Sequence, residues 1–430
     1  MKTIQEDIIP VNGYQLHVVP NSKFKTISMV VKFKAPLEKD TITMRALLPY
    51  LLQQGTKNYP SRTAFQKELN YLYGAVLSID GAKKGENHII SFRLEIANDK
   101  FIPSENGILK EAIKLLNEII CHPNVTEDGF EPNVFAREKQ GLKKKMHAII
   151  DDKMQYANMR LIDEMCKEEA YQLHVYGDEA DLEQLDEKTV YEYYKKMLEE
   201  DQIDFYLLGD LDEASAEKLV ASTMELNSSH QSGATQASSH DVKRESVQEV
   251  LDHQDIQQAK LHIGYRTHCT YRDEDYDALQ VFNGLFGGFP SSKLFLNVRE
   301  KNSLAYYASS RMESHKGLLL VFSGIAPADY EKARNIIEEQ MTAMKQGDFS
   351  ETEMNEIKDL TINQLLETLD NPQGIIEVLY QQVIGQRRRS PDQLLAGIRS
   401  VTKEEVVNVA NRMQEDTVYL LTTKGGAEVE

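Results

Sequence analysis

The chain has 430 residues, of which 41% are hydrophobic and 27% charged, as in an ordinary globular protein. This length is long for one hydrophobic core, so two or more domains are expected. The composition does not indicate disorder. The formal net charge of −19 argues against nucleic acid as the main partner, because phosphate binding requires an excess of Lys and Arg. The negative charge is more compatible with cationic peptides or basic proteins as partners than with nucleic acid. An acidic protein that has no special partner explains the charge equally well.

Cysteine usage and hydropathy both bear on the compartment. The three cysteines, Cys121, Cys166 and Cys269, are odd in number and far apart, so neither a disulfide framework nor a cysteine zinc site is indicated. The N-terminus has no apolar signal-like region, and no run reaches 18 apolar residues. A soluble cytoplasmic protein without a membrane partner is predicted.

The first half of the chain mixes strand and helix patterns without strict β-α alternation. The predicted elements, in chain order, are a strand at 27–34, a helix containing 47–52 that ends at Gly55-Thr56, a helix running into a strand over 65–79, a strand at 88–97, a helix at 109–120, a capped helix at 185–194 and a last strand at 205–209. A segment rich in Ser, Gln, Ala and His follows at 226–244 and is typical of a linker.

The second half repeats this order. Its predicted elements are a strand at 259–265, a helix over 279–286 that ends at Gly287-Gly288, a helix running into a strand over 294–310, a strand at 317–326, a helix at 330–341, a capped helix at 401–410 and a last strand at 418–422. The pattern predicts two homologous α+β domains, 1–225 and 245–430, each an antiparallel sheet covered on one face by helices. Joined by the linker, they are expected to form a clamshell.

The tandem halves, the Gly55-Thr56 turn and the run R-E-K-N-S-L-A-Y from Arg299 resemble the pitrilysin/insulinase-type metallopeptidases over essentially the whole chain. Processing-peptidase subunits belong to the same superfamily. The resemblance implies a first helix with His-x-x-Glu-His, in which two histidines bind Zn²⁺ and the glutamate activates a metal-bound water. It also implies a third ligand, a glutamate from a later helix.

This chain departs from that pattern at every one of those positions. Counted back from the Gly-Thr turn, the motif positions hold Ala46, Pro49 and Tyr50, and Lys145 best matches the third ligand, although Glu138 survives on the same helix. Alanine and proline offer no ligand or base, a neutral phenol is a poor ligand, and a lysine ammonium opposes Zn²⁺. We therefore expect no metal cofactor here. Pro49 should also kink the helix unless it lies in the first turn.

The second-half motif is intact. The resemblance implies that Tyr306 donates a hydrogen bond to the scissile carbonyl or its oxyanion and that Arg299 orients the peptide or the tyrosine. Donors placed in this way stabilise the negative charge that develops during hydrolysis. Tyr307 is the weaker candidate, since it alternates to the other face of a strand. The alternative is that Arg299 caps a helix and Tyr306 fills a half-buried strand position.

A glycine-rich turn precedes that motif. Gly287 and Gly288 can present backbone N–H groups to a ligand, and the resemblance implies substrate recognition by such a loop in non-catalytic subunits. A tight turn that lets helix and sheet approach closely explains the glycines equally well.

Three functions fit this inventory. The first is a non-catalytic subunit that binds peptide and supplies the Arg/Tyr pair to a zinc-bearing paralogue, so that the chain is not an enzyme alone. The second is a non-proteolytic binding factor in a maturation pathway, since the chain resembles Bacillus-type peptidase-like proteins linked to modification of a translation elongation factor. The third is an active peptidase with an unrecognised metal site. Family members often associate, so a homodimer is a further option.

Overall fold

The computed structural model describes residues 4–102, 107–229 and 246–424. Contacts divide the chain into two compact units. The first comprises Met1–Ala148, Leu173–Ala237 and Asn371–Glu377, and the second comprises Ile149–Gln172, Ser238–Asp370 and Val378–Glu430. The division after Ala237 falls within the predicted linker at 226–244, whose residues 230–244 lie outside the described part of the chain. The clamshell arrangement of the two halves stays a prediction.

The first unit contains a mixed sheet with the strand order β1-β2-β8-β3-β5-β4. Its strands are β1 (Asp7–Val11), β2 (Tyr14–Pro20), β3 (Thr26–Pro36), β4 (Val76–Lys84), β5 (Asn87–Ala97) and β8 (Gln202–Gly209). Only β2 and β8 run parallel among these pairs. A short hairpin of β6 (Val125–Thr126) and β7 (Gly129–Phe130) lies apart from this sheet.

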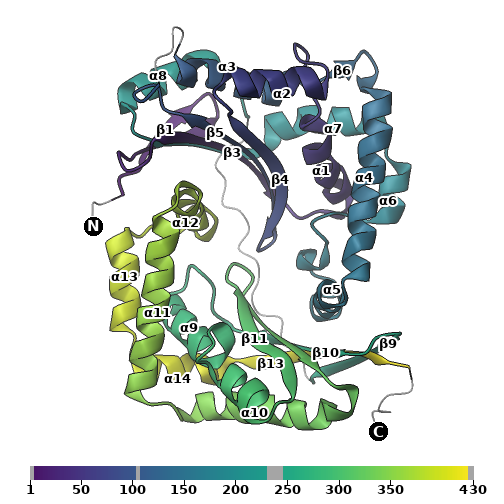
Figure 1. The fold of residues 1–430 in the computed structure, drawn as a ribbon, viewed down its shortest axis with the longest axis vertical. Helices are drawn as coiled ribbons and strands as arrows, with labels where there is room; N and C mark the ends of the chain where they lie inside the picture. Colours follow the sequence, from purple (N-terminus) through teal and green to yellow (C-terminus); the bar gives the residue numbers. More distant parts are fainter. Residues whose placement is uncertain (1–3, 103–106, 230–245, 425–430) are drawn as a thin grey trace. The chain divides into compact units, whose positions relative to one another are not determined.

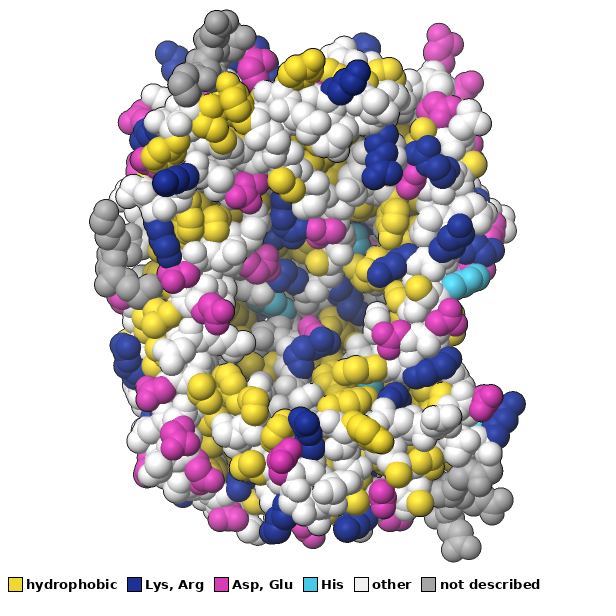
Figure 2. Space-filling view, in the orientation of Figure 1, with side chains coloured by type: hydrophobic (Ala, Val, Ile, Leu, Met, Phe, Trp, Pro, Cys, Tyr) yellow, Lys and Arg dark blue, Asp and Glu magenta, His cyan; other side chains and the backbone are white. Residues whose placement is uncertain are grey.

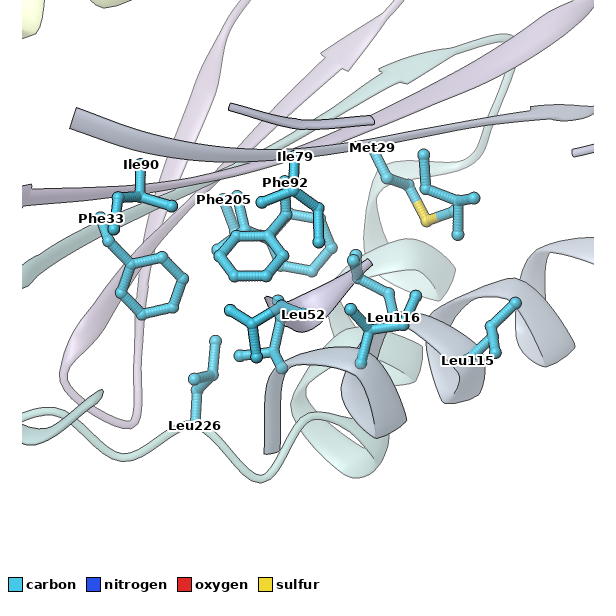
Figure 3. Packing of buried hydrophobic residues seen from close by; sticks show 14 of the residues in the cluster. Met29, Phe33, Leu52, Ile79, Ile90, Phe92, Leu115, Leu116, Phe205 and Leu226 are labelled. Atoms are coloured by element: carbon cyan, nitrogen blue, oxygen red, sulfur yellow. The ribbon is translucent and has the colours of Figure 1, made fainter. Parts of the chain in front are cut away.

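Helices cover the apolar face of this sheet (Figure 1). They are α1 (Lys39–Leu52), α2 (Arg62–Tyr71), α3 (Ile108–Cys121), α4 (Pro132–Asp151), α6 (Glu179–Gln184), α7 (Glu187–Glu200) and α8 (Glu213–Thr223). Alternate residues of β3, namely Met29, Val31 and Phe33, enter the core, as the period of two in a strand requires. Figure 3 shows Phe92 and Phe205 above Leu52 of α1, with Phe33 to their left.

The second unit contains a sheet with the strand order β11-β12-β10-β13-β9. Its strands are β9 (Gln248–Gln254), β10 (Ala259–Arg266), β11 (Ala305–Glu313), β12 (Leu318–Ile325) and β13 (Gln414–Thr423). Only β9 and β13 are parallel among these pairs. The order β9-β13-β10-β12-β11 matches β2-β8-β3-β5-β4 strand for strand, which confirms two homologous α+β halves with helix-covered sheets.

Three helices of the second half lie where the sequence predicts them, namely α9 (Tyr276–Asn283), α10 (Tyr330–Gln346) and α14 (Lys403–Arg412). Three further helices, for which there is no prediction, are α11 (Glu351–Leu369), α12 (Pro372–Gly385) and α13 (Pro391–Ser400). The predicted caps are present: Asp186 accepts a hydrogen bond from the Thr189 N–H at the start of α7, and Thr402 forms a capping box with Glu405 at the start of α14.

Helix α5 (Lys153–Met165) precedes the linker, yet it packs in the second unit. It lies on the face of β10 opposite the core residues Leu261 and Ile263, where Gly264 leaves room for the Met165 side chain. The Arg266 guanidinium donates to the Met165 carbonyl over 2.6 Å and pairs with Glu169 and Asp416. The second sheet therefore has helices on both faces, whereas the sequence predicts one covered face.

Candidate functional site

The helix that corresponds to the zinc helix is α1. Pro49 lies three residues before the end of α1. It is therefore not in the first turn, the position at which a proline would not kink the helix. The proline removes one backbone donor from the helix. The helix is nevertheless packed tightly here, because the nearby Leu48 and Leu51 are at most 3% exposed. Gln53 ties this end of the helix down, because its Nε2 donates to the carbonyls of Pro49 and Ile79 over 2.8 and 2.9 Å. Packing and these bonds hold the helix in place.

The four motif positions do not form a donor set for zinc. Ala46 is 4% exposed and belongs to the apolar core. Tyr50 is half-buried and lies against α4, where a Cβ on Gly141 would be 4.0 Å from its ring. The Lys145 ammonium is 5.7 Å from the centroid of the Tyr176 ring. Within the described ranges, no group of three or more His, Cys, Asp or Glu side chains is placed to hold a metal ion, and the residues do not fit zinc.

The electrostatics around Tyr50 favour a neutral phenol. Burial raises the pKa of Tyr50, and the neighbouring Tyr176 and Glu138 raise it further. Its hydroxyl therefore remains a hydrogen-bond donor at neutral pH. The structure brings Tyr50 and Lys145 together through Tyr176. No local pattern in the sequence indicates Tyr176, because it lies 126 positions beyond Tyr50 in an irregular segment.

A buried charge on α1 was also not anticipated. The Arg45 side chain is fully buried and pairs with the Asp201 carboxylate over 2.8 Å. It also donates from Nε to His88 Nδ1 and from Nη1 to the Tyr193 hydroxyl, each over 3.1 Å. The signal in the sequence is one arginine inside the apolar run M-R-A-L-L, but its partners come from three distant segments. The network fixes α1 against the sheet and α7.

Arg299 and Tyr306 line one pocket of about 500 Å³ in the second unit. Arg299 belongs to a π-helical segment (Phe295–Lys301), and its guanidinium carbon is 4.6 Å from the centroid of the Phe295 ring. Its side chain is 43% exposed, and Tyr306 on β11 is 78% exposed. The pocket also contains Glu300 and Asp329, so it offers donors and acceptors together.

A β-bulge sets the direction of Tyr306. Ala305 pairs with Ile325 and Tyr307 with Gly324, which leaves Tyr306 as the extra residue on β11. Bulges of this kind re-aim a side chain at the edge of a sheet. Tyr307 instead packs beside Gly324, with the Lys260 ammonium 5.6 Å from its ring centroid, and burial raises its pKa to about 12. Of the two tyrosines, Tyr306 lines the pocket with Arg299.

The glycines at 287 and 288 lie in a second π-helical segment (Gly284–Gly288). A Cβ on Gly287 would be 2.6 Å from the backbone nitrogen of Ser310 on β11, and one on Gly288 would be 2.8 Å from the Asn283 side chain. Close approach of this segment to the sheet therefore accounts for Gly287 without a ligand. A role of either glycine in binding substrate stays a prediction.

Two tandem α+β halves, a first helix without zinc ligands and an Arg/Tyr pocket in the second half define a catalytically incomplete zinc-peptidase fold. The chain belongs to the M16 peptidase family. The model described as "Peptidase M16 inactive domain" matches residues 184–361. A Bacillus subtilis (strain 168) protein named "Probable inactive metalloprotease YmfF" is 45% identical over 415 residues, which cover 96% of this chain and 97% of that protein. The predicted resemblance to this family is confirmed.

Two further comparisons bear on the fold and the branch of the family. A conserved protein from Enterococcus faecalis V583, known from its crystal structure, is 33% identical, covers 98% of this chain and 100% of its own, and has a TM-score of 0.91. A Bos taurus protein named mitochondrial-processing peptidase subunit alpha is 26% identical over 159 residues, which cover 34% of this chain and 30% of that protein. No helix within the described ranges is long and apolar enough to span a membrane.

Proposed function

We propose that this chain is the non-catalytic subunit of a heteromeric peptidase, which binds an extended peptide and supplies Arg299 and Tyr306 to a zinc-bearing partner chain. The observation that carries the proposal is the bulge on β11, which places an exposed Tyr306 in one pocket with Arg299. Packing does not explain why a tyrosine exposed to this extent is held on a bulge. Contact with a substrate does explain it.

The chemistry of the pair suits a peptide substrate. A phenol and a guanidinium both donate hydrogen bonds, and such donors stabilise the negative charge that develops on a carbonyl oxygen during peptide hydrolysis. The strand order also leaves β11 at an edge of its sheet and β4 at an edge of the other. An edge strand offers backbone groups with which an extended peptide pairs, so an unfolded chain is the expected substrate class.

The proposal is tested by co-expression with a zinc-bearing paralogue. We expect a complex, and we expect Arg299→Ala combined with Tyr306→Phe to lower the partner's rate of peptide hydrolysis by roughly 100-fold, since one donor to an oxyanion contributes about that factor. Tyr307→Phe is the matched control, because it removes the neighbouring hydroxyl outside the pocket, and it should keep the rate. Absence of a complex, or an unchanged rate in the double variant, would contradict the proposal.

A non-proteolytic peptide- or protein-binding factor in a maturation or translation-factor modification pathway is the second candidate. The observation in its favour is the packing at two of the motif positions: Tyr50 lies against α4, and Lys145 approaches Tyr176. Mass spectrometry of material released from the purified chain tests this candidate. A retained peptide supports it, and full peptidase activity restored by a partner counts against it.

Location and self-association complete the proposal. We place the chain in the cytoplasm, because no disulfide joins Cys121, Cys166 and Cys269, all of which lie in the described part of the chain.

A homodimer is the alternative to the heteromer. Analytical ultracentrifugation of the chain with and without the paralogue separates the two assemblies, and fractionation of cells tests the compartment.

A further inference from the structure

A second pocket, of about 320 Å³, lies beside the end of α1 in the first unit. Tyr50 contributes from α1, Gln53 and Gln54 from the residues that follow it, and Arg62 and Gln66 from α2. Phe65, Leu69 and Leu77 provide apolar surface. No Asp or Glu is among the described residues that line it, although the chain carries a net charge of −19. A pocket without acidic groups in so acidic a protein favours a ligand with negative charge.

Three glutamines line this pocket and all three are engaged. Gln66 donates from Nε2 to the Asn70 side-chain oxygen over 3.4 Å. Gln53 donates to the carbonyls of Pro49 and Ile79, as described above. Gln54 donates from Nε2 to the Tyr50 carbonyl over 3.2 Å, and its Oε1 accepts from the Arg137 guanidinium over 2.9 Å. The shape of the wall is therefore set before a ligand arrives, which lowers the entropic cost of binding.

Among the described residues that line the pocket, Arg62 and Tyr50 are the polar side chains without a hydrogen-bond partner. Across the described ranges, neither the Arg62 guanidinium nor the Tyr50 hydroxyl takes part in a hydrogen bond or ion pair. Because the pKa of Tyr50 is raised, the hydroxyl stays protonated and donates. Both free groups are thus donors and one carries a positive charge, which matches a carboxylate better than any neutral group.

The surroundings of the pocket indicate where such a carboxylate comes from. Leu77 belongs to β4, an edge strand of the first sheet, and the preceding Val76 is 66% exposed. A peptide that adds a strand to β4 would lie next to a strand whose Leu77 lines the pocket. We infer that this pocket binds a carboxylate of an extended peptide, with Arg62 forming the ion pair and Tyr50 donating a hydrogen bond. This inference rests on the proposed peptide binding and adds the chemistry of the ligand.

The carboxylate has two sources, the C-terminus of the peptide or an Asp or Glu side chain. Three fluorescent probe peptides of one extended, apolar sequence distinguish them: one with a free C-terminus, one amidated, and one amidated with a Glu as its last residue. We expect at least one carboxylate peptide to bind the full chain roughly tenfold more tightly than the plain amide, as measured by fluorescence anisotropy. The tighter of the two carboxylate peptides identifies the source.

Three variants test which residues are responsible. Arg62→Gln should remove the preference for the carboxylate peptide, and Tyr50→Phe should reduce it by several-fold while leaving binding of the amide unchanged. Lys67→Gln is the matched control, because it removes one positive charge from an exposed position of the same helix outside the pocket, and it should keep the preference. Thermal melting of each variant confirms that the exposed substitutions leave the fold intact.

The outcomes separate this inference from the proposed function. Equal binding of acid and amide peptides, or a preference that survives Arg62→Gln, overturns the carboxylate site and leaves peptide binding standing. Binding of none of the three peptides overturns the carboxylate site together with peptide binding by this chain. A preference lost equally in Lys67→Gln also overturns it, because general charge attraction would then explain the result.

Discussion

Arg45 shows how one charged side chain is accommodated inside an apolar helix. The desolvation of a fully buried guanidinium is costly unless a counter-charge and hydrogen bonds replace water. Asp201 supplies the charge over 2.8 Å, and His88 and Tyr193 accept two of the remaining N–H groups. Asp201 itself is 6% exposed on its side chain, so each member of the pair depends on the other.

Removal of Arg45 is therefore expected to be more damaging than its size suggests. We predict that Arg45→Met lowers the free energy of unfolding by about 3–5 kcal/mol, because the Asp201 carboxylate is left buried without a counter-charge. Urea denaturation measures the loss. The double variant Arg45→Met with Asp201→Asn should lose less than the single variant, since no uncompensated charge remains.

The matched control for Arg45 is Arg137, whose side chain is 59% exposed. Arg137→Met should change the free energy of unfolding by less than about 1 kcal/mol, as exposed ion pairs contribute little. A loss in Arg45→Met no larger than in Arg137→Met would show that the buried pair does not hold α1 in place.

At the scale of elements, two glycines in helical segments allow the effect of a packing clash on stability to be compared with the effect of helix propensity. A Cβ on Gly287 would meet the backbone of β11 at 2.6 Å, whereas a Cβ on Gly141 of α4 finds nothing closer than 3.8 Å. We predict that Gly287→Ala destabilises the protein by about 1–3 kcal/mol through this clash. Gly141→Ala should instead stabilise it by about 0.5–1 kcal/mol, because alanine favours a helix interior. Thermal or urea unfolding of both variants provides the comparison, and a neutral Gly287→Ala would remove the packing explanation.

The strands and caps were predictable because their signals are local. Alternation over 27–34 and 259–265 locates β3 and β10 to within two residues of their observed ends, and Thr402 three residues before Glu405 marks the start of α14. The bulge at Tyr306 was not predictable, because it depends on the register between β11 and β12. A sequence shows the alternation of one strand but not the pairing of two.

At the scale of the whole molecule, the residue types at the motif positions are visible in the sequence, whereas the packing around those positions is not. The motif positions Ala46, Pro49 and Tyr50 lie on one helix at fixed spacing, so their chemistry is visible in the sequence. The groups that now surround Tyr50, which include Tyr176 and Gly141, come from other segments. The packing of α5 on the second sheet is likewise a long-range property.

On the face in Figure 2, acidic and basic side chains are interspersed, so the net charge does not mark a single binding surface there.

Two buried histidines, one in each unit, link the stability of the whole chain to pH. Burial lowers the pKa of His88 to about 3, helped by the charge of Arg45, and burial lowers the pKa of His262 to about 3 as well. Both are neutral in the folded protein at pH 5, whereas an unfolded histidine takes up a proton near pH 6.5. Because the unfolded chain binds more protons, stability must fall as the pH is lowered from about 6.5 towards 3.

Substitution of His262 isolates one of these contributions from the carboxylates and from His17, whose pKa is raised by Asp204 and Glu6 in opposition to its burial. His262 packs edge-on against Phe322 at 5.0 Å between ring centroids, so His262→Phe keeps the site apolar. Between pH 6 and pH 4.5, the free energy of unfolding of this variant should fall less steeply than that of the unaltered chain, by about 1.4 kcal/mol per pH unit. Urea denaturation across this range measures both slopes, and identical slopes would mean that His262 is already protonated, or accessible to water, in the folded state.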